Sequence, residues 1–122
     1  MCDDRRAADS PLEVTVERPR ATVAVVRATG EVDATTVPVL RSRLADAVSD
    51  TTRDVALDLA GVEFMGSSGL SMLVEAQRAA TARGGVLRLA APSRAVLRPL
   101  ELTGLLELFA VYSDTAAAVS DL

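Results

Sequence analysis

The stretch EFMGSSGLSML, Glu63 to Leu73, joins two apolar segments through a pair of serines flanked by glycines. The segment before it has the composition of a strand, and from Leu70 onward apolar side chains recur at helical spacing. The stretch therefore predicts a strand followed by a helix, with Ser67 and Ser68 in the turn between them. The rest of the sequence has to decide what these two hydroxyl groups do.

Length and composition indicate one globular domain. The chain has 122 residues, and 49% of them are hydrophobic, enough for a single core. No apolar run approaches the roughly 20 residues of a membrane span, and the N-terminus lacks the apolar centre of a secretory signal. We expect a cytoplasmic protein with a disordered tail at residues 1–11 and a domain at residues 12–122. Cys2 lies in the tail without a second thiol, so neither a disulfide nor a metal site is expected there.

The charged residues exclude several classes of function. The net charge is −4, and the arginines are scattered rather than clustered, so we expect neither nucleic acid nor a membrane as a partner. The sequence has no histidine, which removes the usual general base and the commonest metal ligand. It also has no lysine, which removes the P-loop cation and Schiff-base chemistry. The sequence thus predicts a protein without catalytic residues, metal or cofactor.

Strand patterns recur along the whole chain. Residues 12–17 alternate apolar and polar side chains, and residues 21–30 are apolar on both faces, so the second strand should be the more central. Pro19 stands in the link between them, which predicts a hairpin. Three further strands are expected, at 54–62, 86–91 and 105–112.

Helical patterns separate the later strands. Pro38 suits the first turn of a helix that carries Leu40, Leu44, Ala47 and Val48 on one face. A second helix should run from Leu70 to about Arg83 and end at the glycines that follow. Ser93 could cap a third helix, which Pro99 should kink or shorten. Asp114 could cap a short last helix. This alternation predicts an α/β fold, a single-layer mixed sheet of about five strands with about four helices.

Catalysis and phosphate binding are poor explanations of the two serines. Gly66 and Gly69 flank both of them, so the spacing of a nucleophile elbow is off by one, and no histidine exists to take the proton. Glycines and serines at a helix start can present N–H groups to an anion, yet the full P-loop pattern is absent.

Two other roles remain open from the residues alone. A serine can cap the helix, worth about 1 kcal/mol, while Gly69 allows a close approach of the backbone; spacing alone favours this role. A serine at a helix N-terminus can also be a substrate for a kinase, because the helix dipole favours added negative charge.

Three motifs, in the same order, resemble those of STAS-domain anti-sigma factor antagonists. DLAGVEFMGSSGLSMLVEAQRAA (58–80) resembles the family signature, in which Asp-Ser-Ser/Thr-Gly-Leu opens a helix after a strand. ATGEVDATT (28–36) is similar to the family's Gly-Glu-Leu-Asp turn, and LELTGLLELFAVY (100–112) to its later helix end. The likeness spans almost the whole chain and implies a STAS-like fold.

The resemblance implies a bacterial transcription regulator that acts by partner switching rather than catalysis. In unphosphorylated form it would bind an anti-sigma factor, itself a serine kinase of the histidine-kinase-like ATPase type, and so release a sigma factor. That kinase would phosphorylate Ser67, and a serine phosphatase would reverse the modification. The alternative is a STAS scaffold or accessory subunit of a stress-signalling or lipid-transport complex, in which Ser67 is only a cap. A third possibility is nucleotide or anion binding at Ser67–Leu70.

The resemblance also implies a set of partner-binding residues. Ser68 would be a neighbouring cap or packing hydroxyl, and one position departs from the pattern, because Gly66 stands where the family usually has aspartate. Its loss could weaken a contact with the kinase or remove a charge that repels incoming phosphate. Acidic loop residues before a helix are otherwise solvated or favour the helix N-terminus. The predicted partner-binding residues are Glu31, Asp33, Gly66, Ser68, Gly69 and Leu70.

Overall fold

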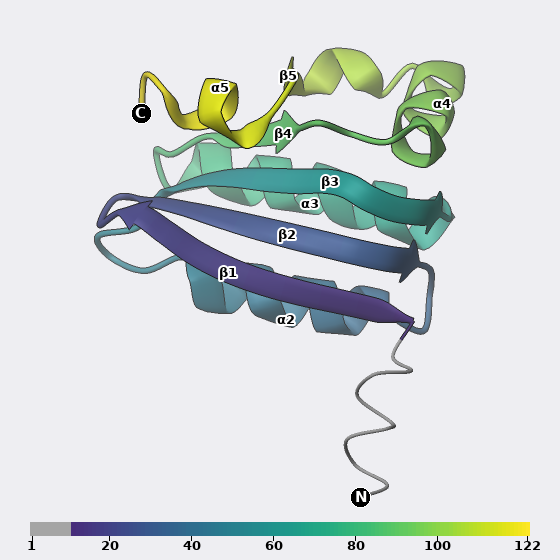
Figure 1. Ribbon diagram of the computed structural model, residues 1–122, viewed down its shortest axis with the longest axis horizontal. Coiled ribbons are helices and arrows are strands. Elements are labelled where there is room, and N and C mark those ends of the chain that lie inside the picture. Colours follow the sequence, from purple (N-terminus) through teal and green to yellow (C-terminus); the bar gives the residue numbers. More distant parts are fainter. Residues whose placement is uncertain (1–10) are drawn as a thin grey trace, which may run out of the picture.

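The strands form one mixed sheet in the computed structural model, which describes residues 11–122. Strands β1 (Leu12–Arg20) and β2 (Val23–Val32) make the predicted antiparallel hairpin. Strands β3 (Asp54–Met65), β4 (Leu87–Ala90) and β5 (Ala110–Tyr112) follow, each parallel to its predecessor, in the order β1-β2-β3-β4-β5 (Figure 1). The predicted mixed sheet of five strands is therefore confirmed. Both Cys2 and most of the expected disordered tail lie outside the described residues.

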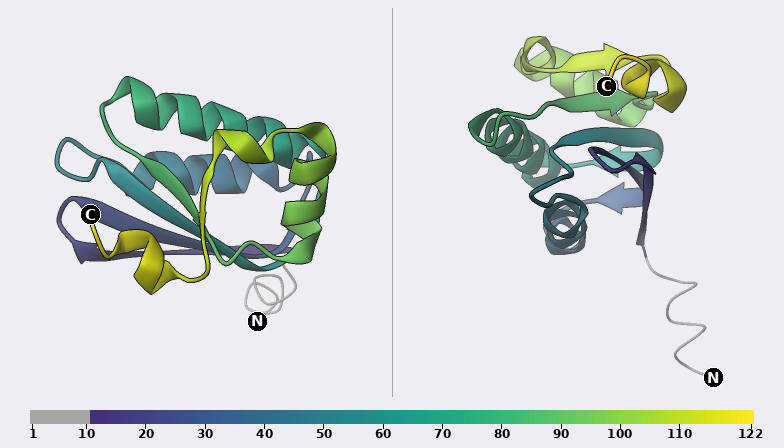
Figure 2. Two further views of the ribbon diagram at one scale, coloured as in Figure 1. Left: turned by 90° about the horizontal axis from the view of Figure 1, so that it is seen from above. Right: turned by 90° about the vertical axis from the view of Figure 1, so that its left-hand side faces the viewer.

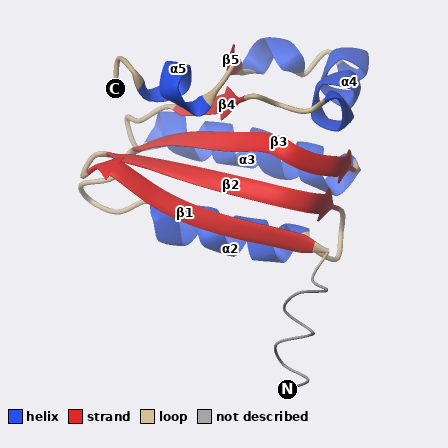
Figure 3. Ribbon diagram, in the orientation of Figure 1, coloured by secondary structure: helices blue, strands red, loops and turns tan. Residues whose placement is uncertain are grey.

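Helices cover both faces of this sheet. Helices α2 (Val37–Ala47) and α3 (Ser67–Ala82) lie against one face, and α5 (Thr115–Val119) lies on the opposite face (Figure 2). Helix α4 (Arg94–Thr103) connects β4 towards β5 through a short 3-10 helix, η1 (Leu106–Leu108). The described residues thus hold the predicted four α-helices, joined by short loops (Figure 3).

Alternating side chains of the strands build a core on each side of the sheet. Val55, Leu57 and Leu59 of β3 point to the α2 and α3 face and are at most 1% exposed. On the other face, Ala56 packs in a smaller cluster with Ala118 of α5. The predicted inner face of α2 is also confirmed, because Leu40, Leu44 and Ala47 are buried and Val48 packs against them.

The last apolar run, at 105–112, was predicted wholly as a strand, which is wrong for its first half. Only Ala110–Tyr112 pairs with β4, and the residues before it form η1. Gly104 has a left-handed backbone with φ of 76°, which turns the chain back after α4. A mostly apolar run fits a short 3-10 turn as well as a strand, so periodicity could not separate them.

Pro99 does not shorten α4, which was one of the two effects expected of it. The helix continues to Thr103, although proline removes one backbone donor from the helix interior, at a cost of about 3 kcal/mol. Val96 and Leu100 are both completely buried on the core. Burying each contributes about 1.5–3 kcal/mol, so the two together offset the proline.

The caps predicted for the last two helices are correct in position. Asp114 accepts a hydrogen bond from the N–H of Ala117 at 2.7 Å at the start of α5. Ser93 is the N-cap residue of α4, but its hydroxyl donates to the carbonyl oxygen of Val62 at 2.6 Å instead of capping the helix. That bond fastens the start of α4 to the carboxyl-terminal part of β3.

Gly69 allows α3 to lie close to the sheet, as the sequence predicts. A Cβ at this position would lie 2.2 Å from Sδ of Met65 and 2.8 Å from Cγ1 of Val32. Both neighbours are buried, so neither can move freely away. The first turn of α3 can therefore contact β2 and β3 only with glycine at 69.

Gly69→Ala should destabilise the fold. A Cβ only 2.2 Å from the Met65 sulfur should place the overpacking cost near the upper end of about 1–3 kcal/mol, which exceeds the roughly 1 kcal/mol by which alanine is favoured over glycine in helices. Urea denaturation should thus show a lower free energy of unfolding, whereas the exposed Ser71→Ala on the same helix should change it by less than about 0.5 kcal/mol. A Gly69→Ala protein as stable as the wild type would contradict the close packing.

Candidate functional site

Ser67 is the first residue of α3 and is exposed to solvent. Within the described part of the chain its hydroxyl has no hydrogen-bond partner, and the backbone N–H groups of Ser67 and Ser68 have none either. These N–H groups belong to the first turn of a helix, which has no earlier carbonyls to bond. The site thus combines an accessible hydroxyl with unused donors at the positive end of a helix dipole.

Neither serine caps α3, so the capping role that spacing alone favours is wrong. The helix begins at Ser67, three residues before the predicted start, and its N-cap is Gly66, without a side-chain hydrogen bond. Gly66 has φ of −87° and ψ of 178°, a conformation open to any residue. The glycine in place of the family's aspartate is therefore not required by the backbone. As an N-cap, glycine is only a few tenths of a kcal/mol worse than the best residues.

The structure brings the loop with Glu31 and Asp33 and the loop with Ser67 together at the carboxyl ends of two neighbouring strands. Strands β2 and β3 are parallel, with Glu31 opposite Phe64 and Val32 opposite Met65. The N–H of Gly66 donates to the carbonyl oxygen of Val32 at 2.9 Å. The turn that follows β2 and the serines that follow β3 consequently lie side by side, at the carboxyl ends of parallel strands, where α/β folds commonly place their binding sites.

Asp33 organises the start of α2. Its Oδ1 accepts hydrogen bonds from the N–H of Thr35 at 2.9 Å and of Thr36 at 3.0 Å. The hydroxyl of Thr36 donates to the carbonyl oxygen of Glu31 at 2.8 Å. Asp33 is half-buried in this network, whereas the Glu31 side chain is exposed. Asp33 thus has a structural role at the turn, and Glu31 is the acidic side chain on the surface.

The remaining predicted residues differ in their exposure. Gly69 and Leu70 are buried, and Leu70 is only 8% exposed. Ser68 is half-buried, and among the described residues its hydroxyl has no hydrogen-bond partner. Gly69 and Leu70 therefore hold α3 in place, while Ser67 offers the accessible hydroxyl.

A groove along α3 extends the site beyond the predicted residues. It has a volume of about 430 Å³, runs from Ser67 to Arg78, and is also lined by Leu105. Ser67, Ser71, Glu75 and Arg78 follow one another at spacings of four, four and three residues, the repeat of one helix face. This spacing was the signal that could have revealed the groove from the sequence.

Phe64 is a second feature that sequence reasoning missed. Its side chain is 51% exposed, and its ring would lie 3.3 Å from a Cβ added at Gly66. An exposed aromatic ring next to an accessible serine is unusual for a solvent-facing surface, since aromatic residues are enriched where proteins bind each other.

Neither a metal-ligating cluster nor a membrane-spanning helix is found among the described residues. Residues 11–122 contain no group of three or more histidine, cysteine, aspartate or glutamate side chains arranged to hold a metal ion. None of the helices described is long and apolar enough to cross a membrane.

Comparison with known proteins identifies the family. The family model of the STAS domain matches residues 14–118, so this chain belongs to the STAS domain family. It is 32% identical over 106 residues to the anti-sigma-F factor antagonist RsfB of Mycobacterium tuberculosis, with 80% of each chain covered. It is 34% identical over 90 residues to the anti-sigma-B factor antagonist of Staphylococcus aureus, covering 74% of this chain and 83% of the relative.

A solved structure agrees with this assignment. The crystal structure of an anti-sigma factor antagonist from Mycobacterium paratuberculosis has a TM-score of 0.78 and 32% sequence identity, covering 89% of this chain and 92% of that one. The resemblance and the STAS-like fold predicted from the sequence are both confirmed.

Asp33→Ala should destabilise the protein by about 1 kcal/mol, because it removes the acceptor for two backbone N–H groups. Asp33→Asn keeps an acceptor oxygen in the same place, so its free energy of unfolding should fall much less. Urea denaturation of the two variants separates the hydrogen bonds from the charge, and exposed Glu31→Ala serves as the control. Equal losses in Asp33→Ala and Asp33→Asn would show that the carboxylate charge matters, and not the two hydrogen bonds to the turn.

Proposed function

We propose that this protein is an anti-sigma factor antagonist, which binds an anti-sigma factor through the surface around Ser67. The observation that carries the proposal is the exposed Ser67 at the start of α3, beside unused N–H donors. The relatives at 32% and 34% identity carry the name of this activity. Binding rather than catalysis would then be the whole activity, in keeping with a chain that has no histidine or lysine.

Phosphorylation of Ser67 by the anti-sigma factor, acting as a serine kinase, is the proposed switch. A phosphoserine carries about −1.5 to −2 charges at neutral pH. The free N–H groups of Ser67 and Ser68 and the helix dipole would stabilise this charge without any rearrangement of α3. The fold can therefore accept the phosphate. Binding of the partner would be weakened instead, because like charges in an interface can cost several kcal/mol. A serine phosphatase would restore the binding form.

The proposed docking surface combines apolar contact with a few charges. Phe64 offers an exposed ring beside the serine, and Val74 and Leu105 give the groove along α3 an apolar lining. Arg78 and Glu75 lie in the same groove and would fix the register of the partner. A partner that controls a sigma factor acts on RNA polymerase, so the proposed location of the complex is the cytoplasm.

Incubation with ATP and the cognate kinase should add one phosphate to the wild type and to Ser68→Ala, but none to Ser67→Ala. Intact-mass spectrometry reads this directly. Ser67→Ala should still bind the kinase, and Ser67→Asp should bind it more weakly. A stable complex without any phosphate transfer would favour a scaffold role, and a phosphate that persists in Ser67→Ala would place the switch elsewhere.

Phe64→Ala should weaken binding of the anti-sigma factor by about fivefold or more, because truncating an aromatic anchor typically costs over 1 kcal/mol. Calorimetric titration provides the dissociation constant. Val111→Ala is the matched control, since Val111 is a comparably exposed apolar residue of β5, outside the docking surface. Equal effects of the two substitutions would argue against docking at Phe64.

A further inference from the structure

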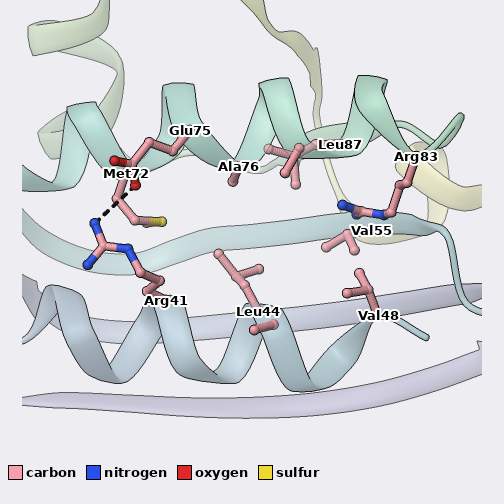
Figure 4. A pocket seen from close by; sticks show the side chains of 11 residues that line it. Arg41, Leu44, Val48, Val55, Met72, Glu75, Ala76, Arg83 and Leu87 are labelled. Carbon is pink, nitrogen blue, oxygen red and sulfur yellow. Dashed lines mark hydrogen bonds and ion pairs between the residues drawn. The ribbon is translucent and has the colours of Figure 1, made fainter.

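A second groove lies between α2 and α3 and is lined by neither Ser67 nor Ser71. Its volume is about 320 Å³, at the lower end of small-molecule pockets. The floor is apolar and comes from both helices and the sheet: Leu44 of α2, Met72 of α3, Val55 of β3 and Leu87 of β4 (Figure 4). Apolar side chains from four elements therefore converge on one space.

Small side chains keep this groove open. Ala45 of α2 and Ala76 and Ala79 of α3 line its walls. Larger side chains at these positions would reach across and close the space between the helices, which in protein interiors is normally filled. The opening is thus a consequence of the alanines and can be closed by substitution.

The two ends of the groove differ in charge. At one end Arg41 donates to Oε1 of Glu75 at 3.0 Å, so its charge is already paired (Figure 4). At the other end lies Arg83, whose Nε donates to the carbonyl oxygen of Arg53 at 3.2 Å. Among the described residues no carboxylate lies within ion-pair distance of Arg83. The groove lining therefore has one uncompensated positive charge.

Arg83 is half-buried, so its guanidinium is partly withdrawn from solvent. Burial lowers the pKa of Arg83, and the more distant carboxylate of Asp54 only partly opposes this. Asp54 is held in place by another bond, since its Oδ1 accepts from the N–H of Val86 at 3.0 Å. An anion that reached Arg83 would thus meet a guanidinium that lacks a full partner.

We propose that this groove binds a small amphiphilic monocarboxylate, with its head group on Arg83 and its apolar tail over the floor towards Met72. One carboxylate matches the single uncompensated charge, and guanidinium and carboxylate can pair in a bidentate manner. Glu75 at the far end disfavours the reverse orientation. Glu75 of α3 and Arg83, the residue that ends the helix, are eight positions apart, or roughly 12 Å along the helix axis, which sets the length of the tail. The proposal is independent of phosphorylation at Ser67.

Titration of the whole protein with decanoate, followed by calorimetry and by NMR of the backbone amides, tests this proposal. Saturable binding with shifts confined to α2, α3 and the adjoining ends of β3 and β4 is expected. Decylammonium has the same tail and the opposite charge, so it should bind at least about tenfold more weakly. Equal affinity for the two probes, or no saturable binding of decanoate, would overturn the proposal.

Two substitutions separate the head-group contact from the tail contact. Arg83→Gln should weaken decanoate binding about tenfold or more, while Arg98→Gln, an exposed arginine of α4, should leave it unchanged. Ala76→Leu should fill the groove and abolish binding without loss of the folded amide spectrum. Undiminished binding to Ala76→Leu would show that decanoate binds elsewhere and would contradict the proposal. If a partner protein shifted the amide signals of the groove and decanoate did not, the occupant would be a protein and the proposal would be wrong.

Discussion

The contact of Gly69 with Met65 and Val32 determines where the whole candidate site lies. Without a side chain at 69, the first turn of α3 can rest directly on the ends of β2 and β3. The bond from the N–H of Gly66 to the carbonyl oxygen of Val32 fixes the same junction from the backbone. Ser67 comes directly after Gly66. Because this junction is fixed, Ser67 is held at the start of α3 with its hydroxyl on the surface.

The fold could largely be predicted from hydrophobic patterns. Strict alternation identified β1, and the apolar run of β2 correctly indicated a central strand. Pattern failed in the run from Leu105, because neighbouring apolar residues fit a 3-10 turn as well as a strand, and η1 forms there before β5. It also failed at Pro99, because the local cost of a proline is visible in the sequence whereas the burial of Val96 and Leu100 on either side is a tertiary effect.

The candidate site was only partly predictable, for different physical reasons. Ser67 and the loop of Glu31 and Asp33 were found through their motifs, and the parallel pairing of β2 and β3 explains why they lie together. The sequence could not show that the carboxylate of Asp33 accepts hydrogen bonds from the turn before α2, because these bonds depend on the conformation of that turn. The sequence also could not show that Phe64 is exposed, since a phenylalanine at the end of a strand is usually expected in the core.

The account depends on one claim, that negative charge on Ser67 separates the protein from its partner while leaving the fold intact. The direct measurement is the dissociation constant of the anti-sigma factor for the chain before and after stoichiometric phosphorylation, with the free energy of unfolding of both forms. The account predicts binding about a hundredfold weaker or more, with equal or slightly greater stability. Equal affinity of the two forms, or a phosphorylated form that unfolds more easily, would contradict it.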